Sequence, residues 1–171
     1  EHKLETFEVV MHGVQGFMTA SENFTYEEFR LYVDALQVPT QLPGVLGIAF
    51  VRMLPSAQID AHVAMARATN FLGYSITPPG ERTHYAPIVY IEPLAGVNEA
   101  ALGFDILTVP AARVALELAL QRNDIAITSP LTLVQDSGLD RTASFVMYLP
   151  VYRNGAPIGT LAEREDAISG W

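Results

Sequence analysis

The chain has 171 residues, a length that suits one domain with a substantial core. Half of its residues are apolar and 17% are charged, which excludes a disordered segment. The net charge of −9 argues against a nucleic-acid surface, because phosphate binding needs clustered Lys and Arg. It also gives no reason to expect contact with an anionic membrane.

The chain contains no cysteine, so disulfides, thiolate zinc sites and thiol nucleophiles are impossible. No apolar run reaches the roughly 18 residues of a transmembrane helix. The longest candidate, residues 45–51, suits a buried strand. The sequence starts without Met inside a helical pattern and ends directly after Gly170 without a stop signal. We therefore expect a piece of a longer protein.

The first predicted element is an amphipathic helix over residues 1–24. Its apolar residues follow the heptad spacing of a coiled coil, at Leu4, Phe7, Met11, Val14 and Met18. This seam covers little more than two heptads, so two interpretations stay open. The helix either covers its own domain, or it is the end of a stalk that pairs with a second copy of the chain.

The next segments predict two helices around a central strand. Thr25 and Glu28 have the spacing of a capping box, and the helix that they begin should end before Pro39. The nearly continuous apolar run 45–53 predicts a buried strand. Ser56 can cap a helix that continues to about residue 68.

The second half of the chain is predicted to be rich in strands. We expect strands at 84–91, 125–135 and 142–152, and Pro110 should begin a helix that Asn123 closes. Asn154-Gly155 is a strong hairpin turn, after which residues 158–161 should pair back. Residues 162–168 look helical. Tight turns between strands predict an antiparallel sheet, so the fold class is α+β, with helices on one side of the sheet.

Motifs of catalysis are missing from the sequence. The histidines are His2, His12, His62 and His84, and none pairs with another at metal-ligand spacing. There is no nucleophile elbow, phosphate loop or dinucleotide fingerprint. We expect no metal, no cofactor and no enzymatic activity, with a small hydrolase as the less favoured alternative.

Several segments together resemble the CHASE domain, an extracytoplasmic sensory module of histidine kinases and cyclases that includes the plant cytokinin receptors. The first is residues 85–93, YAPIVYIEP, followed by Asn98 and Gly103-Phe104-Asp105. Others are Arg113 to Leu116, Ala119, Thr128-Ser129-Pro130, 133–135, 150–152, and upstream Phe29 and 43–51. The resemblance covers residues 25–171, and the segments keep their order and spacing.

The resemblance implies a long stalk helix followed by PAS-like sheet units, of which the membrane-distal one carries the ligand. Residues 1–24 would be the stalk and 25–161 the distal unit. Residues 162–171 would begin the connection to a membrane-proximal unit. The resemblance also implies a periplasmic or extracellular location in a bacterial membrane protein whose output is a kinase or a diguanylate cyclase. This part of the protein would itself make no membrane contact.

Five residues are predicted to contact a small-molecule ligand. Tyr90 and Glu92 share one face of their strand, and Phe104 lies at the corner that should close the pocket. Thr128 matches a threonine that lines the pocket of plant cytokinin receptors. Arg52 could hold a ligand carboxylate or pair with a neighbouring acid. The position of the aspartate that anchors adenine in those receptors falls at or next to Pro93, one residue from Glu92, and this departure argues against a cytokinin as the ligand.

Two partners are predicted, an unidentified small molecule and a second copy of the chain bound through the amino-terminal helix. Other accounts remain for individual residues. Tyr90 and Phe104 could be core aromatics, Thr128 could cap a strand end, Asp105 should fix the turn before Pro110, and Asn98 should close a loop. A ligand-free dimerisation module is the main alternative function.

Overall fold

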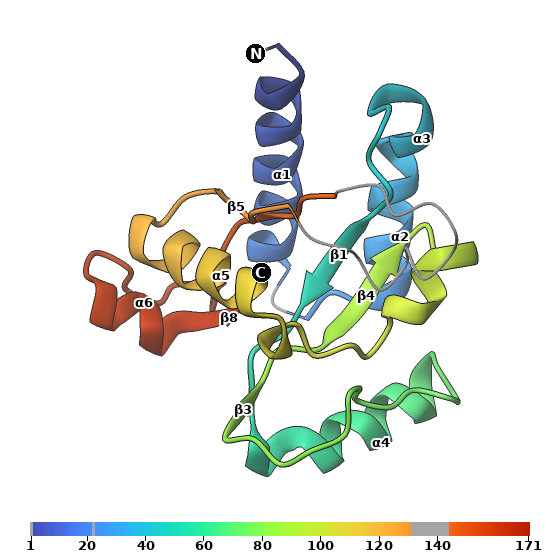
Figure 1. Cartoon of the computed structure of the whole chain (residues 1–171), viewed down its shortest axis with the longest axis vertical. Coiled ribbons are helices and arrows are strands. Elements are labelled where there is room, and N and C mark those ends of the chain that lie inside the picture. Colours follow the sequence, from blue (N-terminus) through green and yellow to red (C-terminus); the bar gives the residue numbers. More distant parts are fainter. Residues whose placement is uncertain (1, 22, 131–143) are drawn as a thin grey trace.

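The computed structural model describes residues 2–21, 23–130 and 144–171. The chain starts with helix α1 (His2–Ala20), which stands in the centre of Figure 1. The other α-helices are α2 (Tyr26–Ala35), α3 (Val38–Gln41), α4 (Ile59–Thr69), α5 (Pro110–Arg122) and α6 (Leu161–Ala167). Short 3-10 helices are η1 (Ser56–Gln58), η2 (Gly96–Ala101) and η3 (Ile106–Thr108). Within these described ranges, no helix is both long and apolar enough to span a bilayer.

The strands form antiparallel pairs. β1 (Ile48–Val51) pairs with β4 (Ile88–Glu92), and β2 (Leu54–Pro55) pairs with β3 (His84–Tyr85). β5 (Ala126–Ile127) pairs with β6 (Met147–Tyr148), and β7 (Val151–Tyr152) pairs with β8 (Ile168–Gly170). The predicted mixture of helices and antiparallel strands is confirmed, and the PAS-like arrangement stays a prediction.

The predicted sheet is divided into short pairs because prolines interrupt the strands. Pro87 separates β3 from β4, Pro93 follows β4, and Pro150 separates β6 from β7. Proline has no N–H to donate to a ladder, so the regular pairing is interrupted at these residues, although the Pro87 carbonyl still accepts from the Arg52 N–H at 3.1 Å. The predictions of strands at 125–135 and 142–152 include residues 131–135 and 142–143, which lie outside the described residues.

One strand prediction is wrong. Residues 158–161 do not pair back after the Asn154-Gly155 turn, and Leu161 begins α6 instead. Thr160 accepts a hydrogen bond from the backbone N–H of Glu163, whose side chain accepts one from the Thr160 N–H, so a capping box starts a helix there. The antiparallel partner of β7 is β8. Residues 162–171, predicted as a connecting segment, therefore lie against this unit, and the Trp171 backbone exchanges hydrogen bonds with Val51.

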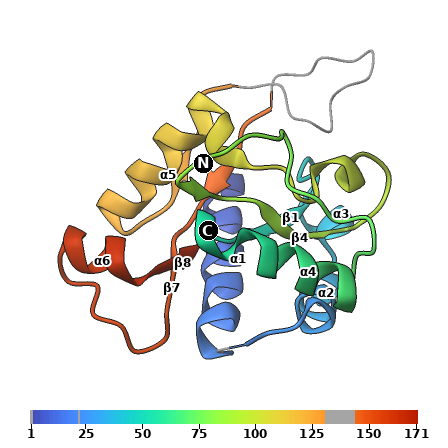
Figure 2. The same ribbon diagram turned by 90° about the horizontal axis from the view of Figure 1, so that it is seen from below.

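The β1–β4 pair lies between two hydrophobic clusters. Seen from below in Figure 2, α5 and α6 lie on one side of α1, and α2 and α4 lie on the other. The α2 cluster centres on Phe29, Val33 and Phe50. The α5 cluster contains Leu116, with residues such as Ile106, Ala112, Ala115 and Ala119 around it. Successive residues of a strand point to opposite faces, so β1 and β4 contribute to both sides.

Candidate functional site: an apolar cavity beside the amino-terminal helix

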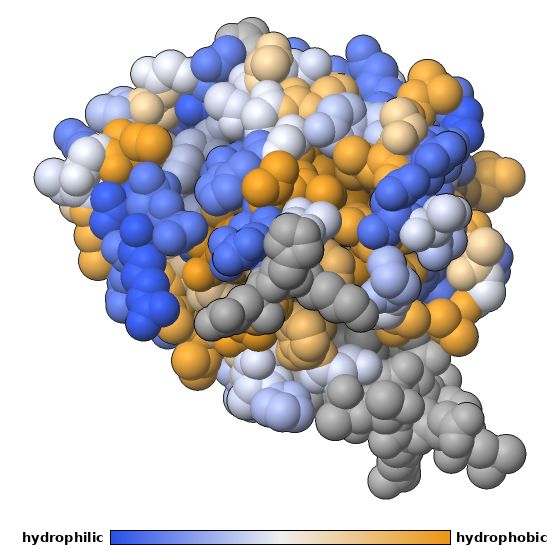
Figure 3. All heavy atoms as spheres, turned by 90° about the horizontal axis from the view of Figure 1, so that it is seen from above, coloured by the Kyte–Doolittle hydropathy of each residue, from blue (hydrophilic) through white to orange (hydrophobic). Residues whose placement is uncertain are grey.

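A cavity of about 600 Å³ lies between α1, the β1–β4 sheet and residues 144–151. We call it the α1–sheet cavity. On the face shown in Figure 3, apolar side chains gather near the centre and hydrophilic ones flank them. The side chains that line the α1–sheet cavity are mostly aliphatic or aromatic and include Val10, Met11, Val14, Ala49, Val51, Ile88, Ile91, Phe104, Ile106 and Trp171.

Strand register decides which side chains reach this cavity. Ala49 lies opposite Ile91 across the β1–β4 pair, and both line the cavity. Phe50 lies opposite Tyr90, one residue further along each strand, and these two side chains belong to the α2 cluster on the other face. Ala49 and Ile91 therefore face the cavity, whereas Phe50 and Tyr90 contact the rings of Phe24 and Phe29.

Helix α1 forms a wall of the cavity with most of its heptad seam. Phe7, Met11, Val14 and Met18 line the cavity, and Val14 and Met18 are buried. Leu4, the first seam residue, is 42% exposed. The seam thus covers its own domain, which was the first of its two interpretations. Pairing of α1 with a second copy remains a prediction.

Charged side chains are missing from the described lining of the cavity, which is polar only at Gln15, Ser144, Tyr148 and Trp171. The Gln15 side-chain amide donates from Nε2 to the Pro150 carbonyl oxygen at 2.6 Å. This bond ties α1 to the segment that joins β6 to β7. Such walls suit binding of an apolar body.

Of the five predicted ligand contacts, Phe104 is the one that lines the cavity. Its position depends on the corner, residues 103–105, where Gly103 donates to the Ile88 carbonyl at 2.8 Å and Ile88 donates to the Phe104 carbonyl at 3.0 Å. The ring packs half-buried against the α5 cluster. It therefore serves the core and the cavity wall together.

Thr128 lies at the end of β5 and is buried. Its hydroxyl oxygen accepts a hydrogen bond from the Val146 N–H at 3.0 Å, and its own N–H donates to the Val146 carbonyl at 2.9 Å. Thr128 therefore closes the β5–β6 pair, as the structural interpretation of this residue expected. It does not line the α1–sheet cavity and lies instead beside the amino-terminal end of α5.

Tyr90, Glu92 and Arg52 lie together on the opposite face of the sheet, which we call the Arg52 face. Glu92 is buried and accepts hydrogen bonds from the Tyr26 hydroxyl and from the Leu94 N–H. Burial, reinforced by this bond to the Glu92 carboxylate, raises the pKa of Tyr26 well above its ordinary value. The Tyr26 ring also contacts Tyr90 at 5.5 Å between centroids.

Arg52 is half-buried, and its guanidinium lies 5.8 Å from the centre of the Phe50 ring. Among the described residues it makes no ion pair and no side-chain hydrogen bond. His62 of α4 and Tyr74 lie nearby, with His62 Nε2 at 3.0 Å from the Tyr74 hydroxyl. The structure thus brings three predicted contacts together here, apart from Phe104 and Thr128.

His62 should make stability depend on pH. Burial, with a smaller contribution from the Arg52 charge, lowers its pKa from 6.5 to about 4. Between these values the unfolded chain binds a proton that the folded domain does not. Stability is therefore lost as the pH falls through this window, by on the order of 1–2 kcal/mol after allowance for solvent access. Urea unfolding of wild type and His62→Gln from pH 7.5 to 4 checks this. An equal loss of unfolding free energy in the two proteins as the pH falls would contradict it.

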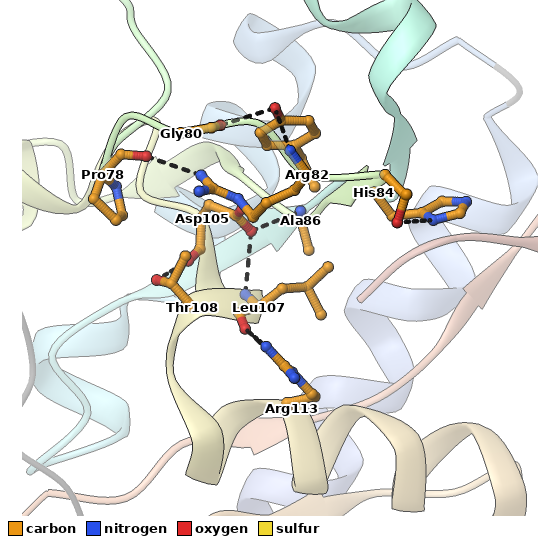
Figure 4. Close-up of polar contacts among 11 residues, drawn as sticks. Pro78, Gly80, Arg82, His84, Ala86, Asp105, Leu107, Thr108 and Arg113 are labelled. Atoms are coloured by element: carbon orange, nitrogen blue, oxygen red, sulfur yellow. Dashed lines mark hydrogen bonds and ion pairs between the residues drawn. The ribbon is translucent and has the colours of Figure 1, made fainter.

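The corner is fixed by a buried ion pair, shown in Figure 4. The Asp105 carboxylate is fully buried and lies 2.7 Å from Arg82 Nε. It also accepts from the N–H groups of Ala86 at 2.9 Å and Leu107 at 3.1 Å. The bond to Leu107 confirms that Asp105 fixes the turn before Pro110. The role of Arg82 could not be predicted from the sequence, because a single arginine in a polar loop gives no local signal.

Asn98 confirms its predicted role in closing a loop. It is buried, and its side-chain amide donates to the carbonyl oxygens of Leu46 and Pro93, both at 2.9 Å. It thereby joins the entrance of β1 to the exit of β4. Among the described residues, no group of three His, Cys, Asp or Glu side chains could hold a metal ion.

Comparison with known proteins identifies the family. The model of the CHASE domain matches residues 22–171. A search among curated proteins finds no match. CHASE domains are extracellular, non-catalytic sensory domains of signalling proteins. Since the match spans nearly the whole sequence, from just after α1 to the last residue, this chain belongs to the CHASE domain family.

Proposed function

We propose that this domain senses a small molecule that binds in the α1–sheet cavity. The domain would be the periplasmic or extracellular part of a bacterial membrane protein with a histidine kinase or diguanylate cyclase output. The observation that carries the proposal is the cavity itself. Its volume of about 600 Å³ lies within the range of small-molecule sites, and its lining is apolar with a few polar groups.

The position of α1 gives the proposal a mechanism. Seam residues of α1 form a wall of the cavity, so a ligand there touches the helix that would lead towards the membrane. A ligand that binds more tightly to one placement of α1 than to another shifts the population towards that placement. In a dimer paired through α1, this shift would change the packing of the two stalks.

Cavity filling tests the site. Ala49→Trp adds a large side chain from β1 into the cavity, whereas the control Ala61→Trp adds it on the exposed side of α4. The ligand is first identified by native mass spectrometry of the purified protein and by analysis of what denaturation releases. At 100 times its Kd, it should stabilise wild type and Ala61→Trp by about 2.7 kcal/mol and Ala49→Trp by close to zero.

The same assay separates the two faces of the sheet. Tyr90→Ala removes an aromatic ring from the Arg52 face without touching the lining of the cavity. If the ligand still stabilises Ala49→Trp but no longer stabilises Tyr90→Ala, the ligand binds at the Arg52 face and the cavity proposal fails. Thr128→Ala gives the matching test for the end of β5.

The absence of any ligand would favour the alternative of a dimerisation module. That alternative predicts a single elution volume that persists on dilution. It also predicts no stabilising compound in a broad thermal-shift screen.

A further inference from the structure

The charges around the α1–sheet cavity point to the class of its ligand. Its described lining contains no Asp, Glu, Lys, Arg or His side chain. An ionised ligand would lose its hydration there without gaining a counter-ion, which is far more costly than burying a neutral group. We infer that the ligand is an uncharged molecule with an apolar body, an inference that rests on the proposed function.

The charges elsewhere in the domain support a neutral ligand. The domain carries a formal net charge of −9, which opposes the approach of anions. Arg52 is half-buried and could bind an anion. Its guanidinium, however, lies over Phe50 on the opposite face of the sheet. A cationic ligand would find no carboxylate in the described lining. Both signs of charge are therefore disfavoured.

Gln15 supplies the polar anchor. Its amide nitrogen donates to the Pro150 carbonyl, which fixes the orientation of the amide because a carbonyl can only accept. The amide oxygen is then left as an acceptor, with no partner among the residues that the structure describes. The ligand should accordingly carry an N–H or O–H group that donates to this oxygen.

This anchor lies on α1, the helix that would transmit the signal in the proposed mechanism. Gln15 is next to the buried Val14 and within one turn of Met18, which both line the cavity. A donor that binds the Gln15 amide oxygen adds a bond to the same amide whose nitrogen joins α1 to Pro150. The donor group of the ligand is thus recognised by a residue of α1 itself.

Two dyes with one skeleton test the inference. N-phenyl-1-naphthylamine is uncharged and has one N–H, and 8-anilino-1-naphthalenesulfonate adds a sulfonate to the same rings. We expect saturable binding of the neutral dye to one site, at least about tenfold tighter than binding of the sulfonate. Fluorescence titration measures both, with cooperative urea unfolding as the check that each protein is folded.

Variants of Gln15 test the anchor. Gln15→Leu should weaken the neutral dye about three- to tenfold, because one hydrogen bond is lost. Gln15→Lys provides a counter-ion and should shift the preference towards the sulfonate, which would support the inference further. If Gln15→Leu leaves the affinity for the neutral dye unchanged, the anchor is wrong.

The outcomes separate this inference from the proposed function. Equal binding of both dyes to wild type, with both lost in Ala49→Trp, would overturn the uncharged class while keeping the cavity as the site. Binding of the neutral dye that is unchanged by Ala49→Trp would instead remove the cavity itself. Ala61→Trp should bind both dyes as wild type does.

Discussion

Replacement of Asp105 by Ala is expected to lower the free energy of unfolding by about 3–5 kcal/mol. The carboxylate is fully buried and is shared by the Arg82 guanidinium and two backbone N–H groups. Its removal leaves Arg82 without its ion-pair partner, and it leaves the buried N–H of Ala86 and the part-buried N–H of Leu107 without their acceptor. The loss should exceed that of a surface pair by a wide margin.

Asp166→Ala is the matched control, because it breaks an ion pair with Arg153 in which Asp166 is 85% exposed. That variant should lose less than about 1 kcal/mol. Arg82→Ala should fall between the two, since Asp105 would keep both N–H donors. Urea unfolding of the three variants checks the order. Equal losses for Asp105→Ala and Asp166→Ala would show that the buried pair contributes no more than a surface one.

The buried pair has a functional side as well. Asp105 follows Phe104, a wall residue of the α1–sheet cavity, and its backbone N–H donates to Thr77 at 2.7 Å. Arg82 also donates to the Pro78 carbonyl, so the loop that returns from α4 is held at the corner. Loss of the pair should therefore disturb the cavity wall and the α4 loop together.

Local signals in the sequence predicted local structure well. The capping box of Thr25 and Glu28, the helix start at Pro110 and the left-handed cap at Asn123 are all present. Each depends on residues within one turn of each other, where spacing alone determines which groups can meet. The bonds of Asp105 to Leu107 and of Asn98 to Pro93 belong to the same class, because they span two and five positions.

Contacts between distant residues could not be predicted in this way. Arg82 and Asp105 are 23 positions apart, and Tyr26 and Glu92 are 66 apart. The strand period placed Tyr90 and Glu92 on one face, but it does not state which helix covers that face. The heptad seam of α1 was ambiguous for a similar reason, because an apolar stripe can pack on its own domain or on another copy.

Replacement of Gly103 by Ala should be nearly as destabilising as the loss of Asp105, by about 2–5 kcal/mol when strain and overlap are added. Gly103 has a φ of +81°, a conformation that L-residues rarely adopt, and a Cβ there would lie 2.1 Å from the Ser75 carbonyl oxygen. The obstacle is backbone, so no side-chain rotation relieves it. The corner or the loop around Ser75 must move.

Gly96→Ala separates the two causes of this loss. Gly96 also has a positive φ, of +58°, but nothing lies within 4 Å of the added carbon. That control should lose only about 1 kcal/mol, the cost of the left-handed conformation. Because Gly103 precedes Phe104, Gly103→Ala should also weaken binding of N-phenyl-1-naphthylamine, and Gly96→Ala should not. Similar unfolding curves for the two variants would show that the close approach of Ser75 does not constrain the corner. The proposed effect of the corner on binding in the cavity would then be wrong as well.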